Sequence, residues 1–321
     1  MLGNQDGPVI ELRGVQKRFG KVTAVAGLDL AVPRGATYGL LGPNGAGKTT
    51  TIRMLLRILN PDAGQILLWG RPVDQAALDR TGYLPEERGL YRRMRVGRLL
   101  AFMAEIKGIP PSKSMPRIRE WLERFGLADR ENARLQELSK GNQQKVQFIA
   151  AVLHEPDIVI LDEPFSGLDV INQQVLKEIV LELKRQERTI IFCTHMIEQA
   201  ERICDHVCIL SRGEKVVDGP LADVKRRHGG EYVAVALEHW TPESMERLRA
   251  GPMVADVREE GHVAEVRLRP DATAQDLLRY VVDAGLPVRR FERVEPSLEQ
   301  IFLERVGARA AAGMTEEVVH V

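Results

Sequence analysis

Residues 42–50 read GPNGAGKTT, which fits the pattern G-x-x-x-x-G-K-[ST]. In this pattern the glycines let successive backbone N–H groups turn inward around phosphate oxygens, while Lys48 brings a positive charge to the β and γ phosphates. The Thr49 hydroxyl is suited to bind Mg²⁺. The preceding TYGLLG is typical of a buried strand and the following TTTIRMLLRIL of a helix, whose free N–H groups add to the attraction. The stretch therefore predicts a strand, loop and helix that bind phosphate.

Composition and charge limit the class of protein. The chain has 321 residues, of which 44% are hydrophobic, which is enough for one large domain or two. Because 45 basic residues balance 45 acidic ones, we expect no nucleic-acid partner. The first residues lack the basic and apolar regions of a signal peptide, and no run reaches the roughly 18 apolar residues that span a bilayer. We therefore expect a cytoplasmic protein. Cys193, Cys204 and Cys208 form no C-x-x-C pair, which favours reduced core residues over a metal or disulfide role.

The order of apolar patterns predicts two domains. Strands alternate with helices up to about residue 229, which indicates an α/β domain with a largely parallel sheet and a helical insert at about 95–155. A boundary is expected near Gly229. Residues 230–306 read as strand, helix, strand, strand, helix and strand, which fits a small α+β domain of the ferredoxin-like βαββαβ type. Residues 307–321 are expected to form a flexible tail.

A pair of carboxylates supplies the second part of a nucleotide site. In VILDEPFSGLD, residues 159–169, a hydrophobic strand ends in Asp162 and Glu163. Asp162 is suited to hold Mg²⁺, usually through its water shell, and Glu163 to polarise the water that attacks the γ-phosphate. The alternative is an acidic strand end that faces solvent, but adjacent buried carboxylates are costly without a cation. His195 follows another strand, TIIFCT, and is placed to hydrogen-bond the γ-phosphate, although taken alone it is more typical of a core or surface histidine.

A third motif lies between these two. Residues 138–145 read LSKGNQQK, with Ser139 and Gly141 just before an apolar helix. On physical grounds this is a helix N-terminus capped by a serine, and also a potential anion site. The order of phosphate loop, LSKGN, ILDEP, SGLD and a histidine at a strand end closely resembles the ATP-binding cassette (ABC) family. The resemblance covers roughly residues 8 to 225.

The resemblance implies a P-loop NTPase fold of the ABC type, with ATP and Mg²⁺ as ligands. In that family two subunits enclose two ATP molecules, so the signature motif of one subunit faces the γ-phosphate bound to the other. The implied ATP-binding residues are Phe19, whose aromatic ring would stack on adenine, Gly42, Pro43, Asn44, Gly45, Ala46, Gly47, Lys48, Thr49, Thr50, Ser139 and Gly141 of the signature, and Asp169 of the D-loop. The implied catalytic residues are Lys48, Glu86, the base Glu163 and the switch histidine His195, and the implied Mg²⁺ ligands, partly through water, are Thr49, Glu86 and Asp162. For Phe19 the alternative is a packing aromatic.

Three positions depart from the family pattern. Lys140 stands where the second signature glycine is usual, and Asn142 where glutamine is usual. In GYLPEERGLY, Glu86 stands in place of the usual glutamine. A carboxylate can still meet Mg²⁺ or its water but cannot donate a hydrogen bond as an amide does, so we expect altered turnover. The alternative is that Glu86 is an exposed loop acid.

Three segments point to a subgroup of the family. YLPEERGLY, LSKGNQQKVQ and the C-terminal extension ending in SLEQIFLERVG look like exporter ATPases of the sodium-efflux and antibiotic-resistance type. This implies a homodimer bound to a separate membrane permease at the cytoplasmic face, with residues 87–104 as the coupling surface, unless these are an ordinary loop and helix. The C-terminal domain is expected to hold the dimer together or regulate it.

Two other function classes remain as alternatives. A soluble ABC ATPase of translation or DNA repair usually has two cassettes, zinc clusters or long coiled coils, none of which this sequence shows. A regulatory module that binds nucleotide without hydrolysing it is disfavoured because Lys48, Asp162, Glu163 and His195 are all present.

Overall fold

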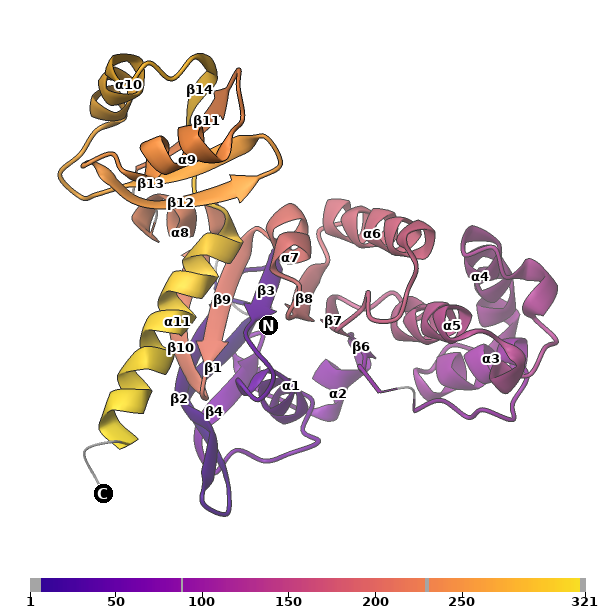
Figure 1. Ribbon diagram of the computed structural model, residues 1–321. Helices are drawn as coiled ribbons and strands as arrows, with labels where there is room; N and C mark the ends of the chain where they lie inside the picture. The colour runs from indigo at the N-terminus through magenta and orange to yellow at the C-terminus, as the bar shows by residue number, and fades with distance from the viewer. Residues whose placement is uncertain (1–6, 88, 229–230, 318–321) are drawn as a thin grey trace. The chain divides into compact units, whose positions relative to one another are not determined.

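The computed structural model describes residues 7–87, 89–228 and 231–317. The chain divides into two compact units, Met1–Pro220 and Leu221–Val321 (Figure 1). The predicted boundary at Gly229 lies outside the described residues.

A six-stranded sheet forms the centre of the first unit, with the strand order β10-β9-β3-β8-β7-β6. Its strands are β3 (Thr37–Leu41), β6 (Thr81–Leu84), β7 (Ile158–Asp162), β8 (Thr189–Thr194), β9 (His206–Ser211) and β10 (Glu214–Pro220). All neighbours pair in parallel except β10, which is antiparallel to β9. Every residue of β3, β7 and β8 is buried, which explains their continuous apolar sequences. Their carboxyl ends lie at one edge of the sheet, where ligands bind in open α/β folds.

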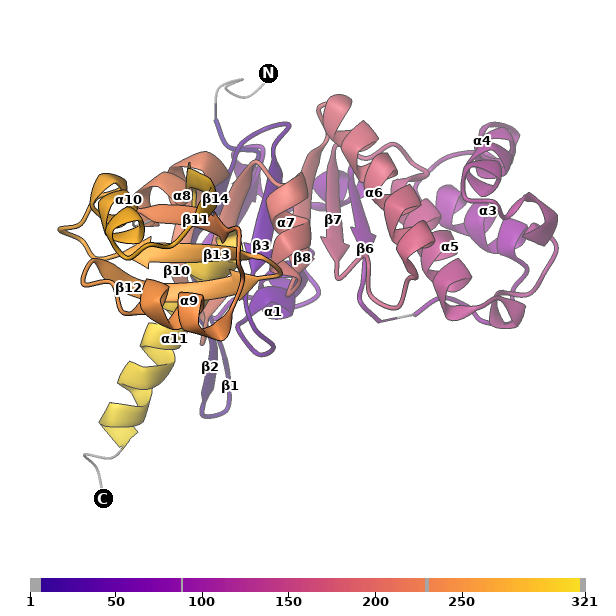
Figure 2. The same cartoon turned by 45° about the horizontal axis from the view of Figure 1, so that its top comes forward.

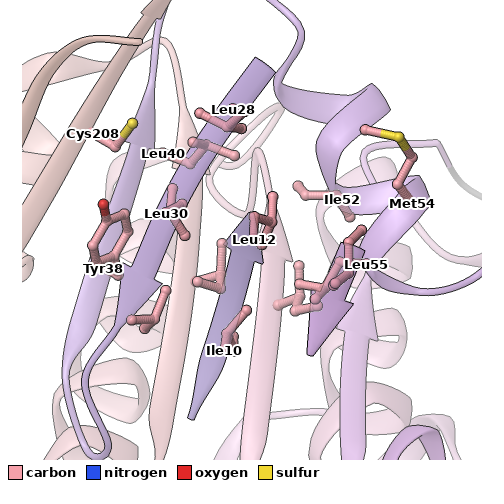
Figure 3. Close-up of a cluster of buried hydrophobic side chains, with 14 of the residues drawn as sticks. Ile10, Leu12, Leu28, Leu30, Tyr38, Leu40, Ile52, Met54, Leu55 and Cys208 are labelled. Atoms are coloured by element: carbon pink, nitrogen blue, oxygen red, sulfur yellow. The ribbon is translucent and has the colours of Figure 1, made fainter. Parts of the chain in front are cut away.

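A second, antiparallel sheet lies over the first helix. It has the order β2-β1-β4-β5 and comprises β1 (Ile10–Phe19), β2 (Val22–Val32), β4 (Ala63–Leu68) and β5 (Arg71–Pro72). Helix α1 (Lys48–Leu55) buries Ile52 and Leu55 against Leu12 of β1 and Tyr38 and Leu40 of β3 in one core cluster (Figure 3). This packing fixes the start of α1 relative to both sheets.

The remaining helices of the first unit include the predicted insert. They are α2 (Gln75–Asp79), α3 (Val96–Ile106), α4 (Pro111–Arg124), α5 (Lys140–Val152), α6 (Val170–Arg185) and α7 (Ile197–Ile203), with short 3₁₀ turns at Ala128–Arg130 and Leu135–Glu137. Leu99 and Leu100 of α3, Ile118 and Leu122 of α4 and Phe148 of α5 are fully buried. Apolar residues at helical spacing are thus buried in each of the three helices of the insert, α3 to α5.

The second unit has the ferredoxin-like order predicted from the sequence. Its elements are α8 (Leu221–His228), β11 (Tyr232–Leu237), α9 (Pro242–Arg249), β12 (Val254–Glu260), β13 (Val263–Leu268), α10 (Ala274–Asp283), β14 (Val288–Val294) and α11 (Leu298–Glu317). The antiparallel sheet has the order β12-β13-β11-β14 (Figure 2). Leu248 of α9 and Leu277 of α10 share one core with Val233 and Val235 of β11. The other side chains of β11 are also buried, and its Tyr232 hydroxyl donates to Glu304 of α11 at 3.1 Å.

The flexible tail expected at residues 307–321 stays a prediction, but most of this segment is helical. Helix α11 continues to Glu317, because residues 308–314 read ARAAAGM and alanine has the highest helix propensity. Residues 318–321 lie outside the described part of the chain.

Candidate functional site

A cleft of about 750 Å³ opens where the adjoining ends of β1 and β2, the loops after β3, β6 and β7, and the turn after β9 meet. It is lined by Phe19, Val22, Thr23, Ala24, Asn44, Gly45, Ala46, Gly47, Lys48, Thr49, Thr50, Glu86, Asp162, Glu163 and Arg212. The structure therefore brings most of the phosphate loop, both carboxylates at the end of β7, and Glu86 to one place.

Two glycines set the shape of the phosphate loop. Gly47 has φ 103°, and a Cβ built on it would lie 2.4 Å from the Ala24 carbonyl oxygen of β2. A Cβ on Gly42 would lie 2.4 Å from the Leu210 carbonyl oxygen of β9. Both distances are shorter than any side chain tolerates, so the loop is seated against two strands at positions where only glycine fits.

The Lys48 ammonium group is held by backbone carbonyl groups of the phosphate loop. Its side chain is buried, with 8% exposed, and its Nζ donates to the carbonyl oxygens of Gly42 at 2.6 Å and Pro43 at 3.1 Å. These contacts place Gly42 and Pro43 at the site although neither lines the cleft itself. A fixed positive charge beside the N-terminus of α1 creates an environment that favours an anion.

Asp162 lies at the floor of the cleft and is only 1% exposed. Among the described residues neither of its carboxylate oxygens has a hydrogen-bond partner. Burial is the largest effect and raises the pKa of Asp162 above its usual range. The neighbouring Cys193 thiol lowers this pKa, the charges of Glu86 and Glu163 raise it further, and Lys48 lowers it to a smaller extent. A buried carboxylate without a partner is costly unless a cation binds it.

The oxygens of Thr49, Glu86 and Asp162 fit a magnesium ion that is bound mainly by phosphate and water. No group of three or more His, Cys, Asp or Glu side chains in the described part of the chain forms a metal site. Mg²⁺ usually keeps several waters and uses one or two carboxylates together with substrate phosphates. The unpartnered oxygens of Asp162 match that mode of binding.

Glu163 and His195, which the sequence suggested separately, are in contact. Glu163 is 6% exposed and has φ 49°, a strained value for a residue other than glycine. Its Oε1 accepts from the His195 backbone N–H at 2.9 Å and from the ring Nδ1 at 2.7 Å, while its Oε2 accepts from the Thr194 hydroxyl at 3.0 Å. The second ring nitrogen of His195 takes no part in these bonds, and the side chain is 57% exposed.

Ser139, Gly141 and Asp169 do not line the cleft. The Ser139 hydroxyl caps α5 by accepting from the Asn142 N–H at 3.3 Å, and Asp169 caps α6 through the Asn172 N–H at 2.9 Å. Gly141 lies beside the same segment, since a Cβ on it would be 3.8 Å from Asn172 Nδ2. These three residues form a second cluster, which we call the signature cluster.

Arg212 and Thr194 were not found by sequence reasoning. Arg212 occupies the turn between β9 and β10 with φ 51°, and Gly213 ties that turn to the phosphate loop through its N–H to the Ala46 carbonyl at 3.1 Å. The arginine-glycine pair between two strands signals a turn, but nothing local indicates which cleft the turn faces. Phe19 was predicted, and it lies at the rim of the cleft, 48% exposed.

A parallel sheet with a phosphate loop after β3, two acidic residues at the end of β7 and a helical insert defines a P-loop ATPase of the cassette class. Comparison with known proteins agrees. Residues 25–166 match the ABC transporter family, and residues 219–306 match the C-terminal domain of DrrA1-3-like ATP-binding proteins.

Two relatives and one solved structure show the extent of the similarity. The chain is 43% identical over 92% of its length to the uncharacterized ABC transporter ATP-binding protein YhaQ of Bacillus subtilis, covering 97% of that protein. It is 32% identical over 93% of its length to the Nod factor export ATP-binding protein I of Burkholderia orbicola, covering 97% of it. An ATP-binding subunit of an ABC transporter superposes with a TM-score of 0.64 at 31% identity, covering 68% of this chain and 92% of that one. The chain belongs to the family of ABC transporter ATP-binding proteins.

Within the described residues, no helix has the length and apolar character required to cross a membrane.

Proposed function

We propose that this chain is the ATP-hydrolysing subunit of an ABC exporter, acting as a homodimer on a separate membrane permease. The observation that carries the proposal is that Lys48, Asp162 and Glu163 share one cleft with the phosphate loop. The similarity to a Nod factor export ATP-binding protein supports an export role. The nature of the exported substrate would be set by the permease.

Each residue of the cleft has a distinct task in this proposal. Lys48 and the N–H groups of the phosphate loop bind the β and γ phosphates, and the Phe19 ring stacks on the adenine. Asp162, with Thr49 and Glu86, would hold Mg²⁺, which when bound offsets charge on the phosphate oxygens. The cleft thus orients the γ-phosphate toward the end of β7.

Glu163 is placed to act as the general base. An ionised carboxylate has roughly four positions that accept hydrogen bonds. Thr194 and His195 occupy three of them, two on Oε1 and one on Oε2. The free position on Oε2 can accept a proton from the attacking water. The same contacts hold His195 beside the base, so its exposed Nε2 is available to the γ-phosphate.

The position of the signature cluster supports the proposed homodimer. Ser139, Gly141 and Asp169 lie outside the cleft, so in one chain they cannot complete its ATP site. Directly after Asp169, the apolar side chains of Val170 and Ile171 are 82% and 78% exposed. Exposed apolar side chains such as these are typical of an interaction surface. We infer that this surface meets the ATP bound to a second copy.

Residues 87–104 are proposed to meet the permease. Within this segment Tyr91 is 57% exposed and Phe102 is 37% exposed, and their rings pack edge to face with centroids 5.8 Å apart. Aromatic side chains are enriched at protein interfaces. Arg88 lies outside the described residues.

Two assays test this function. The purified chain should hydrolyse ATP in the presence of Mg²⁺, and Lys48→Ala should abolish this activity while the chain remains folded by circular dichroism. Co-expression with its permease should yield a membrane complex, and replacing Tyr91 and Phe102 by serine should weaken that complex without changing ATP binding. Capture of ribosomes or DNA in place of a membrane protein would contradict the transport role.

A further inference from the structure

Helix α5 carries two buried glutamines, Gln144 and Gln147, which are 2% and 3% exposed. They are three residues apart and therefore lie on the same side of the helix. A buried amide is retained only where its polar atoms find partners. The partners of these two amides lie in the loops that carry the carboxylates of the cleft.

The side chain of Gln147 binds the backbone on both sides of Glu86. Its Nε2 donates to the carbonyl oxygen of Pro85 at 3.1 Å and to that of Glu87 at 3.0 Å. The two N–H bonds of one amide group thus bind the carbonyls on either side of Glu86, a residue whose own side chain lines the cleft. We call this arrangement the Gln147 clamp.

Gln144 makes a weaker contact of the same kind. Its Nε2 lies 3.5 Å from the carbonyl oxygen of Pro164, the residue after Glu163. This distance is at the limit of a hydrogen bond, so Gln144 holds its loop less firmly than Gln147 does. Gln144 shows that the same face of α5 also reaches the end of β7.

The N-terminal end of α5 is capped by Ser139 of the signature cluster. Gln147 lies in the same regular helix of thirteen residues, Lys140–Val152. A regular helix moves as a unit, because bending it breaks its backbone hydrogen bonds. A shift of the Ser139 end therefore moves the two carbonyls that flank Glu86.

We propose that Gln147 is a positioning residue, which fixes Glu86 in the cleft and links it mechanically to the signature cluster. The proposal rests on the proposed function, because it gives Glu86 a role at the Mg²⁺ and ATP site. It predicts that Gln147 affects hydrolysis through Glu86 and by no other route.

The test uses the full chain with Gln147→Met, which keeps the length of the side chain and removes both donors. The matched control is Lys145→Met, because Lys145 is on the same helix and its Nζ donates to the Phe125 carbonyl, in the insert, at 3.0 Å. Hydrogen exchange without nucleotide is the first readout. Peptides covering residues 82–94 should exchange roughly fivefold faster or more in Gln147→Met, because two hydrogen bonds that hold the loop are lost, and at the parent rate in Lys145→Met. Unchanged exchange in Gln147→Met would overturn the clamp, whether or not the chain hydrolyses ATP.

The second readout is a double-mutant cycle with Glu86→Ala, which removes the side chain that Gln147 is proposed to position. Gln147→Met should lower ATP turnover or raise the Mg²⁺ concentration for half-maximal activity at least threefold in the parent, and should have no further effect in the Glu86→Ala chain. An effect that persists in the Glu86→Ala chain, or no effect in the parent, would overturn the proposal. If the parent itself hydrolyses no ATP, the proposed function fails, and the exchange experiment still decides whether the clamp exists.

Discussion

Replacing the glycines of the phosphate loop one at a time separates backbone strain from steric exclusion. Gly45 has φ 78° and open space where a Cβ would lie, whereas Gly47 has φ 103° and the Ala24 carbonyl oxygen 2.4 Å from that position. Gly45→Ala should therefore show only the conformational cost of positive φ, about 1–2 kcal/mol. Gly47→Ala should add the displacement of a carbonyl held in β2, about 1–3 kcal/mol, for a total loss of about 2–5 kcal/mol.

The free energy of unfolding of the first unit measures this difference. Trp69 and Trp121 belong to that unit and Trp240 to the other, so urea unfolding is followed by tryptophan fluorescence in a Trp240→Phe background. The expected result is a lower midpoint for Gly47→Ala than for Gly45→Ala at equal slope. Equal losses for the two variants would refute the steric argument, and a greater loss for Gly45→Ala would mean that the loop is seated differently.

Three further predictions concern single side chains. Burial and the nearby Lys107 lower the pKa of His154 from 6.5 to about 4, so protonation of the ring favours the unfolded chain. The stability that the neutral ring contributes is complete above pH 6.5 and is lost as the pH falls toward 4, by at most about 2 kcal/mol. His154→Gln should remove this pH dependence of the free energy of unfolding in urea titrations between about pH 4 and 7. Glu86→Gln should change ATP turnover, or its dependence on Mg²⁺, more than it changes ATP affinity, and unchanged turnover across a Mg²⁺ titration with the permease present would count against a catalytic role. Phe19→Ala should weaken ATP binding by about 0.5–1.5 kcal/mol in calorimetry while Phe19→Trp retains it, and equal affinity in all three chains would show that Phe19 only packs.

Much of the first unit was predictable because its signals are local. The phosphate loop, the apolar runs of β7 and β8 and the carboxylates at the end of β7 are each contained in about ten residues of sequence. Strand β4 was not predicted, because only its last three residues, 66–68, are buried and apolar. The antiparallel sheet of the first unit, formed by β2, β1, β4 and β5, was therefore missing from the expected architecture.

The contacts that complete the site come from residues far apart in the chain. Glu163 and His195 are 32 residues apart, and Gln147 is 62 residues from Pro85. A sequence pattern gives the strand or helix on which such residues lie, but which side chains meet depends on how strands and helices pack. The place of Arg212 at the cleft likewise depends on the hydrogen bond from Gly213 to Ala46.

In the proposed mechanism, the signature cluster of a second copy completes the ATP-binding site of the first. Replacing Glu163 with Gln keeps the shape of the side chain and removes the proposed base, so hydrolysis should fall about 100-fold or more while ATP still binds.

Light scattering of the Glu163→Gln chain with ATP is the most direct measurement of this claim. We expect a shift from the 35.9 kDa monomer to twice that mass on addition of ATP. Adding Ser139→Arg should abolish the shift and leave ATP binding by the monomer intact. A Glu163→Gln chain that hydrolyses ATP at the parent rate, or a dimer that is indifferent to Ser139→Arg, would contradict the mechanism.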